Sequence, residues 1–169
     1  MKKILMFSGG IKSSALLSYF MRTKQDVVPV YIMDGLDVSS IIEYYRGNGV
    51  DVVVLNAGDI GVANNSTALW LFMYIGMIMK ANEIVVGFCA EDLAIDLGLW
   101  VHQNLLRTFV RRRYGLKLSL PFAKHDLTRV VSFALAYRVP LALTVTCTCG
   151  TCIKCISRRD AFLKNGIKP

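Results

Sequence analysis

The chain has 169 residues, of which 54% are hydrophobic and 19% charged, and this balance excludes a disordered protein. The length predicts a single compact domain, residues 1–169, and excludes two large ones. Lys and Arg number 20 against 12 Asp and Glu, and the net charge of +8 favours anionic partners such as nucleotides, nucleic acid or anionic lipid. A soluble protein can also carry this charge without any specific partner.

Strand and helix patterns alternate along the chain. Short apolar or β-branched runs predict strands at residues 3–7, 27–33, 50–55, 84–88 and 141–145. Apolar residues at helical spacing predict helices over residues 13–22, 38–46, 65–80, 99–113, 126–137 and 160–163. The alternation predicts an α/β fold, a Rossmann-like parallel sheet with helices on both faces. Ligands of such sheets bind beyond the carboxyl ends of the strands, so the chemistry-bearing motifs should gather at that edge.

The apolar stretches are too short for a signal peptide or a membrane span. The first one stops at Ser8-Gly9-Gly10, which is earlier than the apolar core of a signal peptide would end. The longest, residues 68–79, is bounded by Lys80 and falls short of the roughly 18 apolar residues that a span needs. We therefore expect a cytoplasmic protein that does not enter a membrane.

A glycine- and serine-rich loop joins the first predicted strand to the first predicted helix. It reads Ser8-Gly9-Gly10-Ile11-Lys12-Ser13-Ser14. Its glycines let the backbone approach a ligand, and the helix start offers free N–H groups and a positive dipole end. We predict a phosphate or pyrophosphate cradle, with an ordinary strand-to-helix turn as the alternative. The loop is neither a Walker A loop nor a Rossmann GxGxxG motif.

Four of the five cysteines lie close together near the C-terminus. They are Cys147, Cys149, Cys152 and Cys155, and the last three form two overlapping CxxC steps. Zinc prefers four tetrahedral thiolates, and CxxC turns present cysteine pairs at that geometry. We predict a small zinc knuckle over residues 147–155, structural because four thiolates leave no open position. An iron–sulfur cluster, a redox dithiol or no metal are the alternatives.

Both motifs resemble parts of known enzymes. The loop resembles the SGGxDS loop of PP-loop ATP pyrophosphatases, which split ATP between the α and β phosphates, and Lys12 replaces the motif's Asp. The tail, Cys149-Gly150-x-Cys152-x-x-Cys155-x-x-Arg158, resembles the zinc signature of 7-cyano-7-deazaguanine synthases. The resemblance implies ATP-dependent adenylation of 7-carboxy-7-deazaguanine and its conversion with ammonia to the nitrile, for queuosine or deazapurine synthesis. The implied cofactors are ATP, Mg²⁺ and Zn²⁺, and a homodimer is a further expectation.

The same resemblance assigns roles to individual residues. The residues expected to hold the nucleotide are Ser8, Gly9, Gly10, Ser13, Ser14 and Asp34. Lys124, which follows Pro121-Phe122, is expected to reach a phosphate and to act in catalysis together with Lys12. Lys12 removes a possible magnesium partner from the motif, and its ammonium can neutralise phosphate charge directly.

The chain also departs from the pattern of that family. After Glu91 and Asp92, which either hold magnesium or lie in a solvated loop, residues 93–99 do not match the family's substrate region. One alternative is a related PP-loop enzyme acting on another nucleobase or on tRNA. Because of Lys12, the other is a non-catalytic protein that binds nucleotide and zinc. Nucleic acid is not an expected partner under the first reading.

Overall fold

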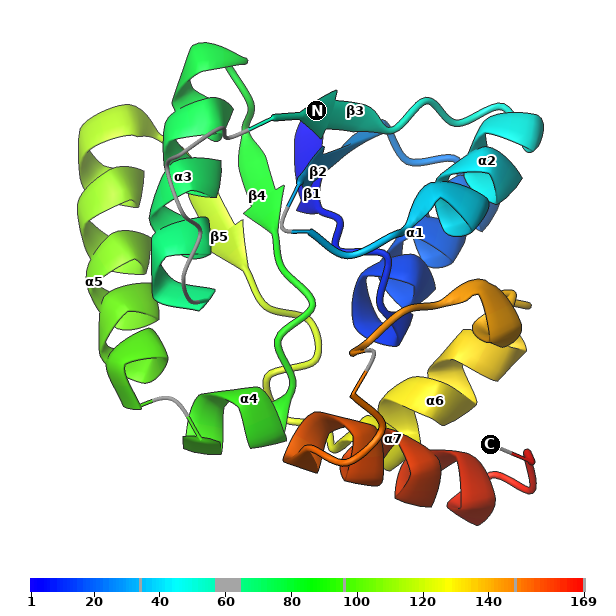
Figure 1. The fold of residues 1–169 in the computed structure, drawn as a ribbon. Helices are drawn as coiled ribbons and strands as arrows, with labels where there is room; N and C mark the ends of the chain where they lie inside the picture. Colours follow the sequence, from blue (N-terminus) through cyan, green and yellow to red (C-terminus); the bar gives the residue numbers. More distant parts are fainter. Residues whose placement is uncertain (34, 57–64, 96, 148, 169) are drawn as a thin grey trace.

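A five-stranded parallel sheet lies at the centre of the fold (Figure 1). The computed structural model describes residues 1–33, 35–56, 65–95, 97–147 and 149–168. The strands are β1 (Lys3–Met6), β2 (Val27–Ile32), β3 (Val53–Leu55), β4 (Glu83–Val85) and β5 (Lys117–Ser119). Their order is β3-β2-β1-β4-β5, and Leu5 in the central strand pairs with Pro29 on one side and Val85 on the other.

Helices cover both faces of this sheet. The helices are α1 (Ile11–Arg22), α2 (Ser39–Gly47), α3 (Asn65–Ile78), α4 (Ala90–Ile95), α5 (Leu97–Tyr114), α6 (Leu127–Ala136) and α7 (Ile153–Lys164). The helices α3 and α5 pack on one face, while α1, α2, α6 and α7 pack on the other (Figure 1). The predicted α/β architecture is confirmed. Within the described ranges, no helix combines the length and the apolar character needed to cross a membrane.

Alternating side chains of the strands build two separate cores. Ile4 of β1 and Ile84 of β4 point into the core beneath α3 and α5. Their neighbours Leu5 and Val85 point into the core beneath α1, α2, α6 and α7. Successive residues of a strand face opposite sides of a sheet, so a strand buried on both faces is a continuous apolar run. This is why the central strands were visible in the sequence.

Several elements differ from the sequence prediction. The strand predicted at residues 141–145 is wrong: Leu141–Leu143 is a short 3-10 helix, in which the Leu143 N–H donates to the Pro140 carbonyl. Strand β5 was missed because Leu118 is its only buried residue, too little for an apolar run. Helix α4 was missed as well. The closing helix α7 begins at Ile153 rather than at residue 160, since its exposed first turns carry no apolar stripe.

Gly76 sets how closely α3 approaches the sheet. A Cβ atom added there would overlap the side chain of Ile84 in β4 and would lie 3.1 Å from Leu116. Helix α3 therefore rests on β4 and on the start of β5 through a position without a side chain. Gly47, at the end of α2, has nothing within 4 Å of such an atom.

We predict that Gly76→Ala lowers the free energy of unfolding by about 1–3 kcal/mol, because the extra methyl group overpacks the core between α3 and β4. The matched change Gly47→Ala should raise stability by about 0.4–1 kcal/mol, since it restricts the unfolded chain and meets no neighbour. Urea denaturation of the two variants measures both effects. Equal stability of the two variants would contradict this account of the α3 contact.

Candidate functional site

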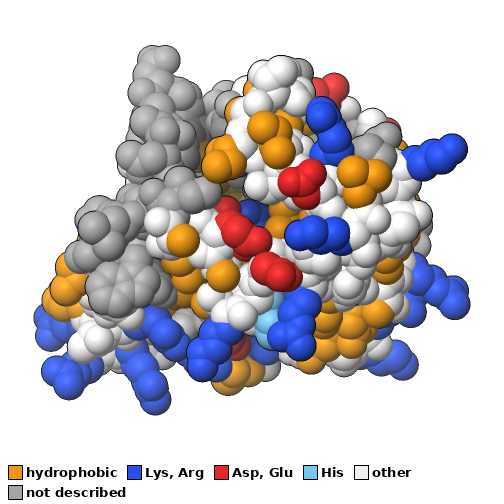
Figure 2. All heavy atoms as spheres, turned by 90° about the horizontal axis from the view of Figure 1, so that it is seen from below, with side chains coloured by type: hydrophobic (Ala, Val, Ile, Leu, Met, Phe, Trp, Pro, Cys, Tyr) orange, Lys and Arg blue, Asp and Glu red, His pale blue; other side chains and the backbone are white. Residues whose placement is uncertain are grey.

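The strand order places a crevice between β1 and β4. The chain passes from β1 to β2 and β3 on one side, then returns to β4 and β5 on the other, so the connections diverge beyond the carboxyl ends of β1 and β4. A cavity of about 230 Å³ lies at this edge. Figure 2 views the same face from below and shows acidic and basic side chains side by side near its centre. The cavity therefore lies at the sheet edge where the motifs were expected to gather.

A ring of hydrogen bonds fixes the loop between β1 and α1. The Ser8 N–H donates to the Ser13 hydroxyl over 3.2 Å, and the Ser13 hydroxyl lies 3.2 Å from both the Ser8 hydroxyl and the Gly10 carbonyl. Gly10 is the N-cap of α1 and supplies no side-chain cap. The first N–H groups of α1 are therefore available to an anionic ligand, as the positive end of the helix dipole favours.

The predicted phosphate residues divide between the cavity wall and the packing behind it. The cavity is lined by Ser8, Gly10, Lys12 and Ser13 from the loop and by Glu91 and Asp92 from α4. Sequence analysis left Glu91 and Asp92 undecided between a magnesium site and a solvated loop. Both residues are half-buried in helix α4 and line the cavity, so neither lies in a solvated loop.

The other predicted residues lie elsewhere. Gly9, at φ +70°, is packed against Val38, so its role is to let the loop turn and not to line the cavity. Ser14 is completely buried, and its hydroxyl has no hydrogen-bond partner among the described residues. Lys124 is exposed and lies outside the described cavity lining. Asp34 falls outside the described residues.

An ion pair crosses the cavity wall between α1 and α4. Lys12 Nζ lies 2.6 Å from each carboxylate oxygen of Asp92. The Cys89 N–H and thiol also donate to Asp92 Oδ2, over 2.8 and 3.2 Å. Burial raises the pKa of the Cys89 thiol to about 12, so this thiol remains a protonated donor at neutral pH. A Cβ atom on Gly87 would lie 3.1 Å from the Lys12 backbone, so the end of β4 presses directly against the start of α1.

The C-terminal segment forms the opposite wall. The Val145 N–H donates to the Gly9 carbonyl over 3.0 Å, which ties this segment to the loop. Arg158 donates to the Thr146 hydroxyl over 2.9 Å and lies over the Phe162 ring, 4.8 Å from its centre. The sequence indicated no site role for Val145 or Thr146, and Arg158 was noted only as part of the cysteine signature. The position of Arg158, one turn after Cys155 in α7, could have indicated that its side chain lies at the site.

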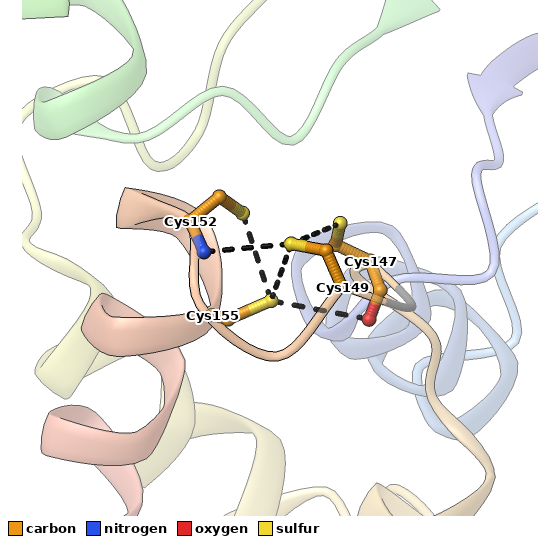
Figure 3. Close-up of side chains that lie close together, drawn as sticks. All are labelled: Cys147, Cys149, Cys152 and Cys155. Carbon is orange, nitrogen blue, oxygen red and sulfur yellow. Dashed lines mark hydrogen bonds between the residues drawn. The ribbon is translucent and has the colours of Figure 1, made fainter.

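The four clustered cysteines converge on one point in space (Figure 3). Their sulfur atoms all lie within 4.8 Å of one another, and neighbouring pairs are 3.3, 3.6 and 4.0 Å apart. A tetrahedral zinc–thiolate site has sulfur–sulfur edges of about 3.8 Å. The arrangement could hold a metal ion such as zinc.

The backbone around the cysteines prepares at least one sulfur for a metal. Hydrogen bonds from the N–H groups of Thr151 and Cys152 lower the pKa of Cys149 to about 6, which favours the thiolate. Helix α7 begins immediately after Cys152, so a metal held here would fasten the start of that helix. Four sulfur ligands leave no position for a reacting molecule, which fits a structural role.

The chain is similar to a distantly related protein along nearly its whole length. No known protein-family profile matches the chain. The chain is similar to the protein named 7-cyano-7-deazaguanine synthase 1 of Desulfitobacterium hafniense (strain Y51), with 24% identity over 202 aligned residues. The alignment covers 95% of this chain and 91% of that protein, so the similarity concerns the whole fold and not one motif. An identity of 24% does not by itself assign the chain to a family.

We predict that the purified chain contains about one zinc ion per molecule. The substitution Cys152→Ser should lower the zinc content to less than half. It should also lower the melting temperature, because the metal no longer holds the start of α7. Elemental analysis and thermal unfolding measure the two effects. Cys89→Ser is the matched control, because Cys89 lies outside the cluster and should leave zinc content unchanged. Iron with labile sulfide in place of zinc would contradict the assignment and favour an iron–sulfur cluster.

Proposed function

We propose that this chain is an ATP-dependent enzyme of the 7-cyano-7-deazaguanine synthase kind. It would adenylate the carboxylate of 7-carboxy-7-deazaguanine and convert it with ammonia to the nitrile. The observation that carries the proposal is the cavity in which the loop at residues 8–10, the start of α1 and the C-terminal segment meet. The distant similarity to a protein of that name along nearly the whole chain supports it.

The cavity suits the phosphates of a nucleotide. Backbone N–H groups at the start of α1 and the hydroxyls of Ser8 and Ser13 would donate to phosphate oxygens. Lys12, Lys154 and Arg158 line the same cavity and would offset phosphate charge. Lys124, which lies outside the described cavity lining, and Asp34 remain proposed contacts of the nucleotide. Magnesium for the reaction would arrive bound to the nucleotide, because Glu91 Oε2 is the one lining carboxylate oxygen without a hydrogen-bond partner within the described residues.

The proposed reaction proceeds in two activations. A carboxylate oxygen of the substrate attacks the α-phosphorus of ATP, and pyrophosphate leaves. Ammonia then attacks the acyl carbon, and AMP leaves to give the amide with loss of a proton. The amide oxygen then attacks the α-phosphorus of a second ATP, and a second pyrophosphate leaves. The amide nitrogen loses both protons as AMP leaves and the nitrile forms. The chain's part is to position the reactants and to stabilise phosphate charge.

The Lys12–Asp92 ion pair favours a second candidate. In it the protein binds nucleotide and zinc but has lost turnover, because an ammonium stands where the PP-loop pattern has a carboxylate. The altered region after Asp92 similarly leaves room for a different nucleobase or a tRNA substrate within the first proposal. A homodimer in the cytoplasm, with a deazapurine and ammonia as its small-molecule partners, completes the first proposal.

We predict that the native chain, given ATP, magnesium, ammonium and 7-carboxy-7-deazaguanine, forms AMP and the nitrile, both read by mass spectrometry. Ser13→Ala should lower AMP formation about 10- to 100-fold, because it removes hydrogen bonds from the loop and from a charged ligand. Ser132→Ala, on the exposed side of α6, is the control and should leave the rate unchanged.

The Lys12→Asp variant, assayed beside the native chain, separates the two candidates. Product from the native chain establishes the synthase. Product from Lys12→Asp alone establishes the non-catalytic protein as a degenerate enzyme. If neither forms AMP and the folded, zinc-containing native chain binds no ATP, both candidates are wrong.

A further inference from the structure

Both carboxylate oxygens of Asp92 are engaged by neighbouring groups. Both of its oxygens contact Lys12 Nζ at 2.6 Å, and Oδ2 also accepts the Cys89 N–H and thiol. Magnesium binds through ionised oxygen ligands at near-ideal octahedral geometry. An ammonium at hydrogen-bond distance from both oxygens therefore occupies the side of Asp92 that a cation would need.

Glu91 has at most one carboxylate oxygen available to a metal ion. Its Oε1 accepts the Leu127 N–H over 2.9 Å and so is engaged at the start of α6. Its Oε2 is buried and has no hydrogen-bond partner in the part of the chain that the structure describes. Among the described residues that line the cavity, this is the one carboxylate oxygen without a partner. The wall thus lacks the paired carboxylates that would hold a divalent cation before a nucleotide arrives.

The Lys12–Asp92 pair reproduces the net charge of a metal site. One ammonium and one carboxylate sum to zero, as do a divalent cation and two carboxylates. An ammonium has three N–H donors. Two of them face Asp92, and the remaining neighbour is the Cys89 sulfur at 3.9 Å, a weak acceptor. One donor can therefore turn to a phosphate oxygen while the ion pair persists.

The position of the ammonium is fixed from two sides. A Cβ atom on Gly87 would lie 3.1 Å from the backbone of Lys12, so the two segments pack closely, and Asp92 is anchored by the Cys89 N–H. The Lys12 side chain still keeps 31% of its surface exposed and lines the cavity beside Gly10 and Ser13. The charge thus lies at the phosphate loop and is accessible from the cavity.

We infer that Lys12, oriented by Asp92, acts at the phosphate loop in place of a protein-bound divalent cation, so that the cavity binds nucleotide phosphates without a metal ion. This inference rests on the proposed function, because it takes the ligand of the cavity to be a nucleotide. It makes Lys12 the residue that decides whether the site depends on magnesium.

The test measures ATP binding to the zinc-loaded chain by calorimetry, first without other divalent cations and then with excess magnesium. The native affinity should be the same in both buffers. Lys12→Gln should weaken metal-free binding about tenfold or more, because it removes a charge-assisted hydrogen bond. Lys12→Glu should abolish metal-free binding and should bind Mn²⁺ directly by electron paramagnetic resonance, since its carboxylate would face Asp92.

Lys164→Glu, at the exposed end of α7, makes the same change in net charge away from the cavity and should match the native chain in both readouts. Native binding that magnesium tightens by about tenfold or more would overturn the inference and leave the proposed nucleotide site standing. Mn²⁺ binding by the native chain without nucleotide would also overturn it. No ATP binding by the folded native chain in either buffer would overturn the inference and the proposed function together.

Discussion

The close contact between Gly87, just after β4, and the start of α1 is the constraint on which the candidate site depends. At Gly87 an added Cβ atom would lie 3.1 Å from the Lys12 backbone and 3.3 Å from the Ser13 nitrogen. A side chain at residue 87 would have to push the two segments apart by a few tenths of an ångström, so glycine permits their closest approach. Because they meet, residues 80 positions apart, Lys12 and Asp92, form an ion pair on one cavity wall.

The second wall comes from the far end of the chain. The hydrogen bond from the Val145 N–H to the Gly9 carbonyl joins the C-terminal segment to the loop between β1 and α1. Arg158 then links that segment to α7 through the Thr146 hydroxyl and the Leu141 carbonyl. The cysteine cluster lies between these two connections along the chain. A metal held by the cysteines would therefore stabilise the cavity from outside, without taking part in chemistry.

The sequence predicted those features whose residues are contiguous in the chain, either because a strand is buried or because a site needs neighbouring residues. The central strands, the loop at residues 8–14 and the cysteine cluster are all contiguous, and each was predicted before the fold was known. Strand β5 and the 3-10 turn at Leu141–Leu143 are short, and tertiary pairing decides their structure more than propensity does. The pairing of Lys12 with Asp92 could not be predicted from the sequence, because it depends on the strand order and on the close packing at Gly87.

Hydrogen exchange with and without ATP tests most directly whether the loop and the C-terminal segment form one nucleotide site. The zinc-loaded native chain would be labelled in both conditions and digested into peptides. The account predicts slower exchange on ATP addition in residues 8–14 and 145–158, and unchanged exchange in α3. Protection confined to the hollow between α1 and α6, or no protection in either segment, would contradict it.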